Sequence, residues 1–271
     1  MIATALRRAV RLPLLIGLLF GGLFTVLVLF PFGDEAFRHG AIRRWSRMLI
    51  AACGVRADPQ RADGAKTLAE LPPGHLVVAN HVSWIDIFVI NAQCPCGFVA
   101  KAEIARWPLI GTLVARTGTL FIERGKRHAV HRMIEHIGAR LQVGGRVAVF
   151  PEGTTGDGRG LLPFHANLIE GAVRCGAPVV PVGLRYLDGD GDTASQIEYI
   201  GDTTFVASAW RIIGSPSIRC EVIALHEIAT GDGASRHEVA GRAREAMAQA
   251  LGLPLEDALP EKLRELRRTA G

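Results

Sequence analysis

Residues 75–91 read HLVVANHVSWIDIFVIN, an apolar β-branched run followed directly by a helical pattern. Short apolar runs and helical patterns continue to alternate along the chain as far as about residue 225. Such alternation is typical of α/β domains, in which helices connect parallel strands. We therefore predict a largely parallel or mixed sheet flanked by helices. The expected strands are His75–Ala79, Gly97–Ala100, Thr119–Ile122, Arg146–Phe150, Pro178–Tyr186 and Ser217–Leu225, and the expected helices between them are Trp84–Asn91, Glu103–Thr117, Arg127–Gln142 and Phe164–Cys175.

The first 56 residues differ from the rest in charge and hydropathy. The whole chain has 31 Lys and Arg against 26 Asp and Glu, but eight arginines and only two acidic residues lie in 1–56, so the basic excess belongs to this segment. No charge occurs in the 22 residues from Leu12 to Gly33, enough for one pass through about 30 Å of hydrocarbon. Because arginines flank this run on both sides, we expect both flanks on the cytoplasmic side, as a helical hairpin or a shallow insertion.

Between Glu35 and Ala52 the apolar residues recur at steps of three and four, which predicts a basic amphipathic helix. Such a helix lies on anionic lipid or packs on an ordinary core, and the pattern leaves both readings open. The expected organisation is therefore membrane-anchoring helices in 1–56, an Asp-, Pro-, Gly- and Ala-rich linker in 57–74, an α/β domain in 75–230, and C-terminal helices in 231–271, at Ser235–Leu251 and Leu259–Arg268.

Composition excludes several classes of protein. With 49% hydrophobic and 21% charged residues, the chain is neither disordered nor fibrous. Its five cysteines are scattered, which favours a reduced protein without a zinc site. The pair His128 and His131 reads as a solvated helix face, so we expect no metal. Basic charge beside an apolar anchor argues against nucleic acid as a partner.

His81 and Asp86 follow the first apolar run, where an α/β sheet usually presents its site. Within one helix a spacing of five residues would separate them by about 140°, so His81 must precede the helix for the pair to meet. Ser83-x-x-Asp86 is a capping-box pattern that would start the helix at Trp84. Asp86 could therefore act on His81 or only cap the helix, and His81 could be a packed or hydrogen-bonded histidine.

Four segments together resemble a known family. They are Asn80-His81-x-Ser83-x-x-Asp86, Phe121-Ile122-x-Arg124, Phe150-Pro151-Glu152-Gly153-Thr154 and Val180-Pro181-Val182. In order and spacing these resemble the four motif blocks of the glycerolipid acyltransferases, a family that includes the 1-acylglycerol-3-phosphate acyltransferases. The resemblance covers about residues 75–190, and it implies a membrane enzyme with its active site on the cytoplasmic face of the inner membrane.

The resemblance implies a role for each motif residue. His81 would be the general base on the acceptor hydroxyl, and Asp86 would orient and stabilise its ring. The acyl donor would be a thioester of coenzyme A or acyl carrier protein, with no cofactor. Backbone N–H groups at the helix start would be oxyanion donors, and Ser83 would be the helix cap.

The resemblance also implies substrate-binding residues. Lys101 and Arg124 would bind an anionic head group. The acceptor would be bound by Glu152, Gly153 and Thr154, although Glu152 could instead tie down a loop. Pro181 would shape the substrate groove.

One position departs from the family pattern. Many members continue Phe-Pro-Glu-Gly-Thr with arginine, where this chain has Thr155. Either Arg124, Lys101 or Arg159 binds an acceptor phosphate without that arginine, or the acceptor is not a phosphate, as in lyso-ornithine lipid acylation. The alternatives of other classes are a non-catalytic lipid-binding membrane protein and a serine hydrolase, and the chain contains no Gly-x-Ser-x-Gly elbow for the latter.

Overall fold

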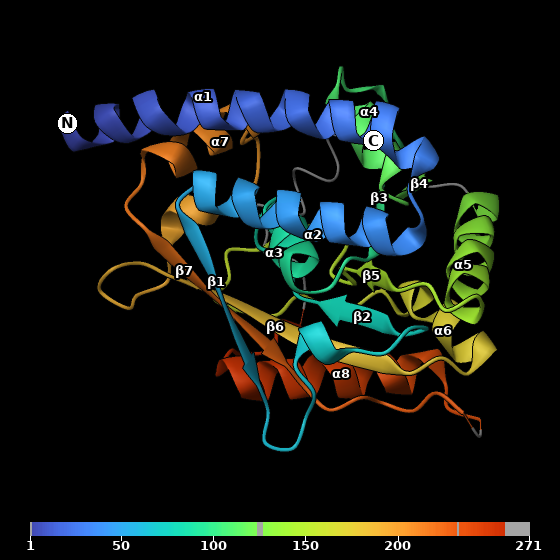
Figure 1. The fold of residues 1–271 in the computed structure, drawn as a ribbon. Coiled ribbons are helices and arrows are strands. Elements are labelled where there is room, and N and C mark those ends of the chain that lie inside the picture. The colour runs from blue at the N-terminus through green and yellow to red at the C-terminus, as the bar shows by residue number, and fades with distance from the viewer. Residues whose placement is uncertain (1, 124–126, 232, 258–271) are drawn as a thin grey trace.

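The computed structural model describes residues 2–123, 127–231 and 233–257 (Figure 1). In this part of the chain a seven-stranded sheet has the order β1-β7-β6-β2-β5-β3-β4. All neighbouring strands are parallel except β6 and β7, which are antiparallel. This confirms the mixed α/β sheet. The strands are β1 Val55–Arg61, β2 Leu76–Ala79, β3 Gly97–Lys101, β4 Leu120–Ile122, β5 Val147–Val149, β6 Val179–Leu187 and β7 Ile218–Ala224.

Helices cover both faces of the sheet (Figure 1). Their bounds are α1 Ile2–Phe24, α2 Glu35–Ala52, α3 Asp86–Gln93, α4 Ile110–Arg116, α5 Arg127–Gln142, α6 Glu170–Cys175, α7 Phe205–Gly214 and α8 Arg236–Leu251. Successive residues of the buried strand β2 point to opposite faces. Val77 and Ala79 face the core that contains α2 and α3, whereas Leu76 and Val78 face the core that contains α5, α6 and α8.

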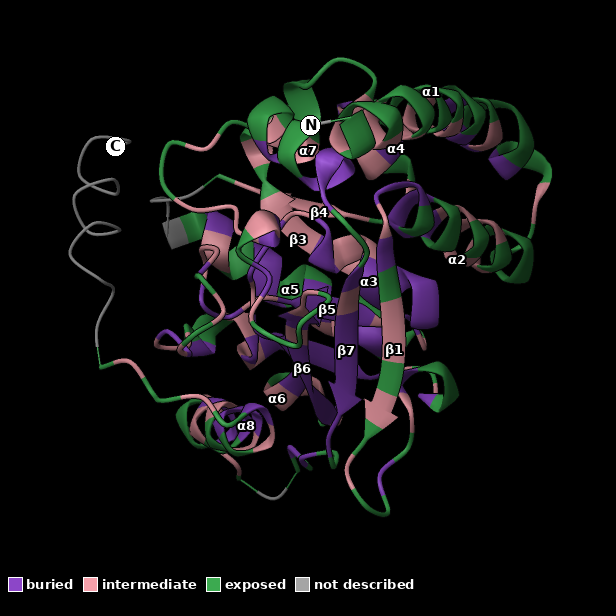
Figure 2. Ribbon diagram, turned by 90° about the vertical axis from the view of Figure 1, so that its left-hand side faces the viewer, coloured by how far each residue is buried: buried purple, intermediate pink, exposed green. Residues whose placement is uncertain are grey.

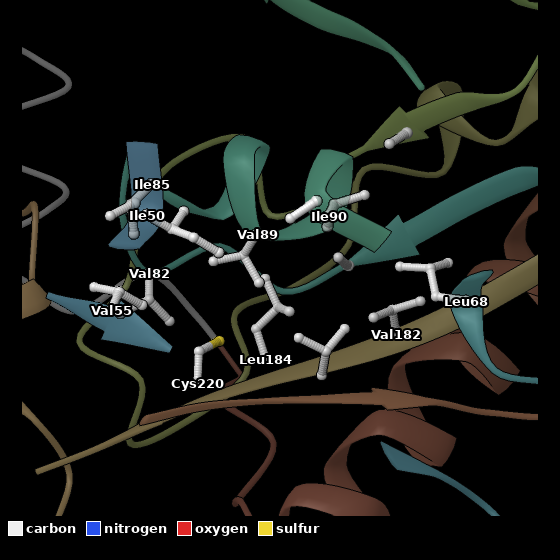
Figure 3. Packing of buried hydrophobic residues seen from close by; sticks show 14 of the residues in the cluster. Ile50, Val55, Leu68, Val82, Ile85, Val89, Ile90, Val182, Leu184 and Cys220 are labelled. Atoms are coloured by element: carbon white, nitrogen blue, oxygen red, sulfur yellow. The ribbon is translucent and has the colours of Figure 1, made fainter. Parts of the chain in front are cut away.

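The core beneath α3 places the start of that helix firmly against the sheet. In Figure 3, Val89 and Ile90 of α3 lie over Val182 and Leu184 of β6. Colouring by burial shows the central strands as the buried layer and the outer faces of α1 and α2 as exposed (Figure 2). The segment between β2 and α3 therefore lies over a closely packed apolar core.

The N-terminal helices form the expected hairpin. The helical segment runs from Ile2 through short π- and 3₁₀-helical turns to Phe32, and α2 returns beside α1 after the N-cap Asp34 (Figure 1). Ile2–Phe32 is long and apolar enough to cross a membrane, by length and composition only. The helix starts ten residues before the uncharged run, so the first three arginines lie within it. One side of α1 rests on α2 and α7.

Two local expectations were wrong, and one helix was missed. The 57–74 segment is not simply a linker, because residues up to Arg61 form the edge strand β1, which pairs with β7; Pro59 is tolerated there because an edge strand need not donate every N–H. The helix expected at Glu103–Thr117 divides into a 3₁₀ turn, Ala102–Arg106, and α4, since Pro108 interrupts it. α7 was not anticipated. The expected helix Leu259–Arg268 lies outside the described residues.

Candidate active site

The candidate site forms where parallel strands end together. His81 follows β2, and Phe150, Pro151 and Glu152 follow its neighbour β5. Parallel strands bring their carboxyl ends to one edge of the sheet. The first and third motif blocks, about 70 residues apart in the chain, therefore meet around His81.

His81 and Asp86 form a hydrogen-bonded pair. His81 Nδ1 lies 2.8 Å from Asp86 Oδ2; the histidine side chain is 19% exposed and the aspartate is fully buried. With Nδ1–H donating to the carboxylate, the Nε2 atom carries the lone pair. The ring stacks on Phe150 with centroids 4.0 Å apart and planes 11° apart. A histidine held at one nitrogen and packed on one face is suited to accepting a proton at the other nitrogen.

Asp86 is the centre of a buried hydrogen-bond network. Its Oδ2 accepts the backbone N–H groups of Val82 at 2.8 Å and Ser83 at 2.9 Å, and its Oδ1 accepts the Tyr186 hydroxyl at 2.5 Å. Donors from three directions stabilise a charged carboxylate away from water. The network therefore fixes both the position and the orientation of the oxygen that faces His81.

This network overturns the expected role of Ser83. The helix starts at Asp86 rather than at Trp84, and its N-cap residue makes no side-chain cap. Among the described residues the buried Ser83 hydroxyl has no hydrogen-bond partner. The carboxylate of Asp86 instead reaches back to the preceding turn. Val82 and Ser83 donate their N–H groups to Asp86, so these two groups are engaged. The oxyanion role of N–H groups at the helix start stays a prediction.

Glu152 holds the loop that carries His81. It is 2% exposed, and its two oxygens accept the N–H of His81 at 2.7 Å and of Leu162 at 3.0 Å. Burial raises the pKa of Glu152 to about 8; the two backbone hydrogen bonds oppose this rise, and the nearby charge of Asp86 adds to it. Glu152 ties down the loop, which is the second of the two roles considered for it.

The rest of the third motif wraps around the same histidine. Gly153 has φ of +66°, a conformation that favours glycine, and its N–H donates to the Phe150 carbonyl at 3.0 Å. Gly156 N–H donates to the His81 carbonyl at 2.7 Å. Thr154 is partly exposed beside this turn, and the Thr155 hydroxyl donates to the Tyr199 carbonyl. Both backbone polar groups of His81 are therefore bound, the N–H by Glu152 of the third motif and the carbonyl by Gly156 just after it.

The other candidate residues are distributed around this edge. Lys101 is the exposed last residue of β3, and Arg124 lies outside the described residues. Pro181 is buried within β6, opposite Val78, and its carbonyl accepts the Leu225 N–H at 3.0 Å. Arg159 pairs with Glu198 at 2.7 Å. Their substrate roles stay predictions.

Sequence reasoning missed Tyr186. It lies on β6, 100 residues after Asp86, and it is buried beside Cys220; burial and the charge of Asp86 raise its pKa well above the ordinary tyrosine value. Asn80 is a second contact across the sheet, since its side chain accepts the Leu184 N–H at 2.7 Å and donates to the Leu184 carbonyl at 3.0 Å. In the sequence, Tyr186 and Asn80 could have been noticed as polar side chains within or at the end of apolar runs.

Metal binding finds no support in the described part of the chain, where no group of three or more potential ligands comes together. His131 instead lies 3.1 Å from Glu135 on the exposed face of α5.

The known proteins to which this chain is similar are acyltransferases. A family model described as "Acyltransferase" matches residues 63–185. The chain is 36% identical over 190 residues to the 1-acyl-sn-glycerol-3-phosphate acyltransferase of Neisseria meningitidis serogroup B, covering 70% of this chain and 72% of that relative. It is 37% identical over 177 residues to the lyso-ornithine lipid O-acyltransferase of Pseudomonas aeruginosa, covering 65% and 67%. The crystal structure of the 1-acyl-sn-glycerophosphate acyltransferase of Thermotoga maritima has the same fold, with a TM-score of 0.64 at 20% identity, over 91% of this chain and 96% of that one.

Proposed function

Because the chain belongs to the acyltransferase family, we propose that it is a membrane-associated O-acyltransferase acting on 1-acylglycerol-3-phosphate. It transfers a fatty acyl group from an acyl thioester to the free hydroxyl and produces phosphatidic acid. The donor is acyl-CoA or acyl carrier protein, and no cofactor takes part. The observation that carries this proposal is the 2.8 Å contact between His81 and Asp86 at the carboxyl edge of the sheet.

The geometry supports a direct transfer. His81 Nε2 removes the proton from the acceptor hydroxyl as its oxygen attacks the thioester carbonyl. Asp86 stabilises the imidazolium ion that forms. The carbon–sulfur bond breaks, the ester forms, and the thiolate leaves with the proton from His81. This sequence needs no nucleophilic serine, and it uses a histidine already held in the required tautomer by Asp86.

A second acceptor is favoured by one observation. Thr155 replaces the arginine common in the family, and Arg159, a possible substitute, is paired with Glu198. Lys101 and Arg124 are the other two candidates for a phosphate ligand. A lyso-ornithine lipid, whose head group is an amino acid, is the alternative acceptor, and the similarity to the Pseudomonas aeruginosa enzyme agrees with it.

The membrane hairpin supports a cytoplasmic-face enzyme at the inner membrane. Along the outer side of α1 large apolar residues are exposed, among them Leu14, Phe20 and Phe24. The arginines near its N-terminus bind the end of α7 instead of extending into solvent. A helix attached to the domain along its length is suited to lying in the membrane surface with its outer side in lipid.

The test is acyl transfer by the full chain in membranes with a labelled donor. Replacement of His81 with alanine should lower the rate about 10²–10⁴-fold, whereas His136→Ala, on the exposed face of α5, should leave it unchanged. Full activity of His81→Ala contradicts the catalytic proposal. An acceptor panel of lysophosphatidic acid, lyso-ornithine lipid and other lysophospholipids identifies the substrate. If lysophosphatidic acid is not acylated, it is excluded as the acceptor.

A further inference from the structure

A cavity lies at the opposite edge of the sheet from His81. Its volume is about 480 Å³, and Leu120 and Val147, the first residues of β4 and β5, contribute to its wall. His81 follows the last residue of β2, whose strand runs parallel to β5. The cavity and the candidate active site are therefore separated by the length of the sheet.

The lining of this cavity is strongly basic. Three arginines line it from three separate elements, namely Arg38 of α2, Arg116 of α4 and Arg140 of α5, and His39 of α2 is also in the lining. Glu35 is the one acidic residue among the lining side chains that the structure describes. Three arginines against one carboxylate leave an excess of two positive charges in a concave site.

The existing contacts do not neutralise that excess. Arg140 Nη2 is 3.4 Å from Glu35 Oε1, a long contact between exposed groups. Arg38 donates from Nε and Nη2 to the Phe30 carbonyl, which fixes its guanidinium without neutralising it. Arg116 has no ion-pair partner among the described residues. The carboxyl ends of α4 and α5 add only partial negative charge, which three full charges outweigh.

We propose that this cavity binds the phosphate group of an anionic ligand. Guanidinium groups form parallel hydrogen bonds to phosphate oxygens, and Thr117 and Thr119 belong to the same lining. Burial lowers the pKa of His39, and the nearby arginines lower it further against the opposing effect of Glu35. A neutral imidazole beside arginines can donate a further hydrogen bond to the anion.

The position of the cavity indicates a lipid head group as one source of the phosphate. Phe30 contributes to its lining, and Phe32, two residues further along the turn of the hairpin, is 89% exposed. An exposed aromatic side chain at the end of an apolar helix is suited to the boundary between head groups and acyl chains. With the turn at this boundary, the cavity beside it is within reach of lipid phosphates. Free phosphate has the same chemistry and is the other source.

Vesicle binding by the full chain tests the proposal independently of acyl transfer. Wild-type protein and the Arg116→Gln/Arg140→Gln variant are compared by flotation with phosphatidylcholine vesicles that contain or lack phosphatidylglycerol. The control, Arg56→Gln/Arg132→Gln, removes the same charge from two exposed arginines outside the cavity. We expect the cavity variant to lose the phosphatidylglycerol-dependent binding about tenfold more than the control. Equal losses in the two variants overturn the proposal, because bulk charge then explains the binding.

A second arm separates the two sources and checks folding. Thermal unfolding of the detergent-solubilised protein is followed with inorganic phosphate and with chloride at equal ionic strength. Stabilisation by phosphate of the wild type and the control, but not of the cavity variant, identifies a site that accepts the free anion. If the cavity variant loses phosphatidylglycerol binding and phosphate does not stabilise the wild type, the site is assigned to the lipid head group. Should the double variant unfold, Arg116→Gln alone serves, since this side chain makes no described polar contact; vesicle binding equal to the wild type then contradicts the proposal.

Discussion

The Tyr186 hydroxyl donates a hydrogen bond of 2.5 Å to Asp86 Oδ1, whereas His81 binds the other carboxylate oxygen, Oδ2. Both Asp86 and Tyr186 are buried. The tyrosine thus belongs to a chain of contacts from β6 to the candidate base, and it acts on His81 only through Asp86. It is a positioning residue in the proposed mechanism.

Replacement of Tyr186 with phenylalanine should lower kcat about tenfold and leave KM nearly unchanged. The ring still fills its site, but Asp86 loses one donor, and a hydrogen bond to a charged group contributes about 1.5–3 kcal/mol. Steady-state kinetics with saturating donor measure the effect. Tyr199, the other tyrosine of the chain, provides the control Tyr199→Phe. A change confined to KM would show that Tyr186 contributes to binding and not to positioning.

Substitution of Asp86 with asparagine should reduce kcat more severely, by about 10³–10⁴-fold, because an amide can donate to Nδ1 and so favour the unproductive tautomer of His81. The same change removes an acceptor shared by three donors on Oδ2, so the melting temperature should fall as well. Kinetics and thermal unfolding of the same preparation separate these effects. A folded variant with near-wild-type kcat would exclude Asp86 from the mechanism.

The sheet could be predicted from the sequence where a strand is buried on both faces. β2 is a continuous apolar run and β6 is apolar apart from Arg185, and hydrophobic runs of this kind indicate strands buried on both faces. β1 could not be recognised, because its sequence, VRADPQR, is polar and contains proline. It is a strand because β7 provides hydrogen-bond partners along one side, a long-range contact that no local pattern contains.

The sequence predicts the part of the candidate site that the motif residues form, but not the contacts that residues outside the motifs add. His81, Asp86 and Glu152 meet because parallel strands end at one edge, which sequence can indicate. Tyr186 depends on the register between β2 and β6, which brings a residue 100 positions away onto Asp86. Ser83 was misinterpreted because only half of the capping box forms. The Asp86 carboxylate accepts the Ser83 N–H, but the Ser83 hydroxyl has no partner among the described residues, and the same carboxylate also binds His81.

Glu152 should make stability depend on pH in a specific direction. Its pKa in the folded protein is about 8, above the ordinary glutamate value of 4.5. Between these values the unfolded chain releases the proton while the folded protein retains it. The free energy of unfolding should therefore decrease as pH rises from about 4.5 to about 8, by at most about 1.4 kcal/mol per pH unit, and this contribution should be constant above pH 8.

Glu152→Gln tests this dependence because glutamine resembles the protonated acid and does not titrate. Denaturant unfolding of both proteins at a series of pH values should show a smaller decrease for the variant over that range. The exposed Glu245→Gln on α8 is the control and should follow the wild type. Parallel curves for wild type and Glu152→Gln would mean that the buried carboxyl does not retain its proton.

The N-terminal helix is joined to the catalytic domain through the end of α7. Arg11 donates to the carbonyl of Ser215 at 2.7 Å and of Ile213 at 3.2 Å, and Arg7 donates to the carbonyl of Gly214 at 2.9 Å. These carbonyls lie at or just beyond the carboxyl end of α7, where positive charge is favourable. α7 in turn contacts the start of the candidate site, because Ser208 accepts the indole N–H of Trp84 at 3.2 Å.

Arg11→Gln should therefore loosen α1 from the domain without unfolding the sheet. We expect faster hydrogen exchange in α1 and in the last turn of α7, corresponding to about 1–2 kcal/mol for the lost charged hydrogen bonds. Exchange in β2 and β6 should stay at the wild-type rate. The exposed Arg44→Gln on α2 removes the same charge and should change neither helix. Exchange that accelerates equally in both variants would assign the attachment of α1 to its apolar contacts, because the arginine would then contribute only general charge.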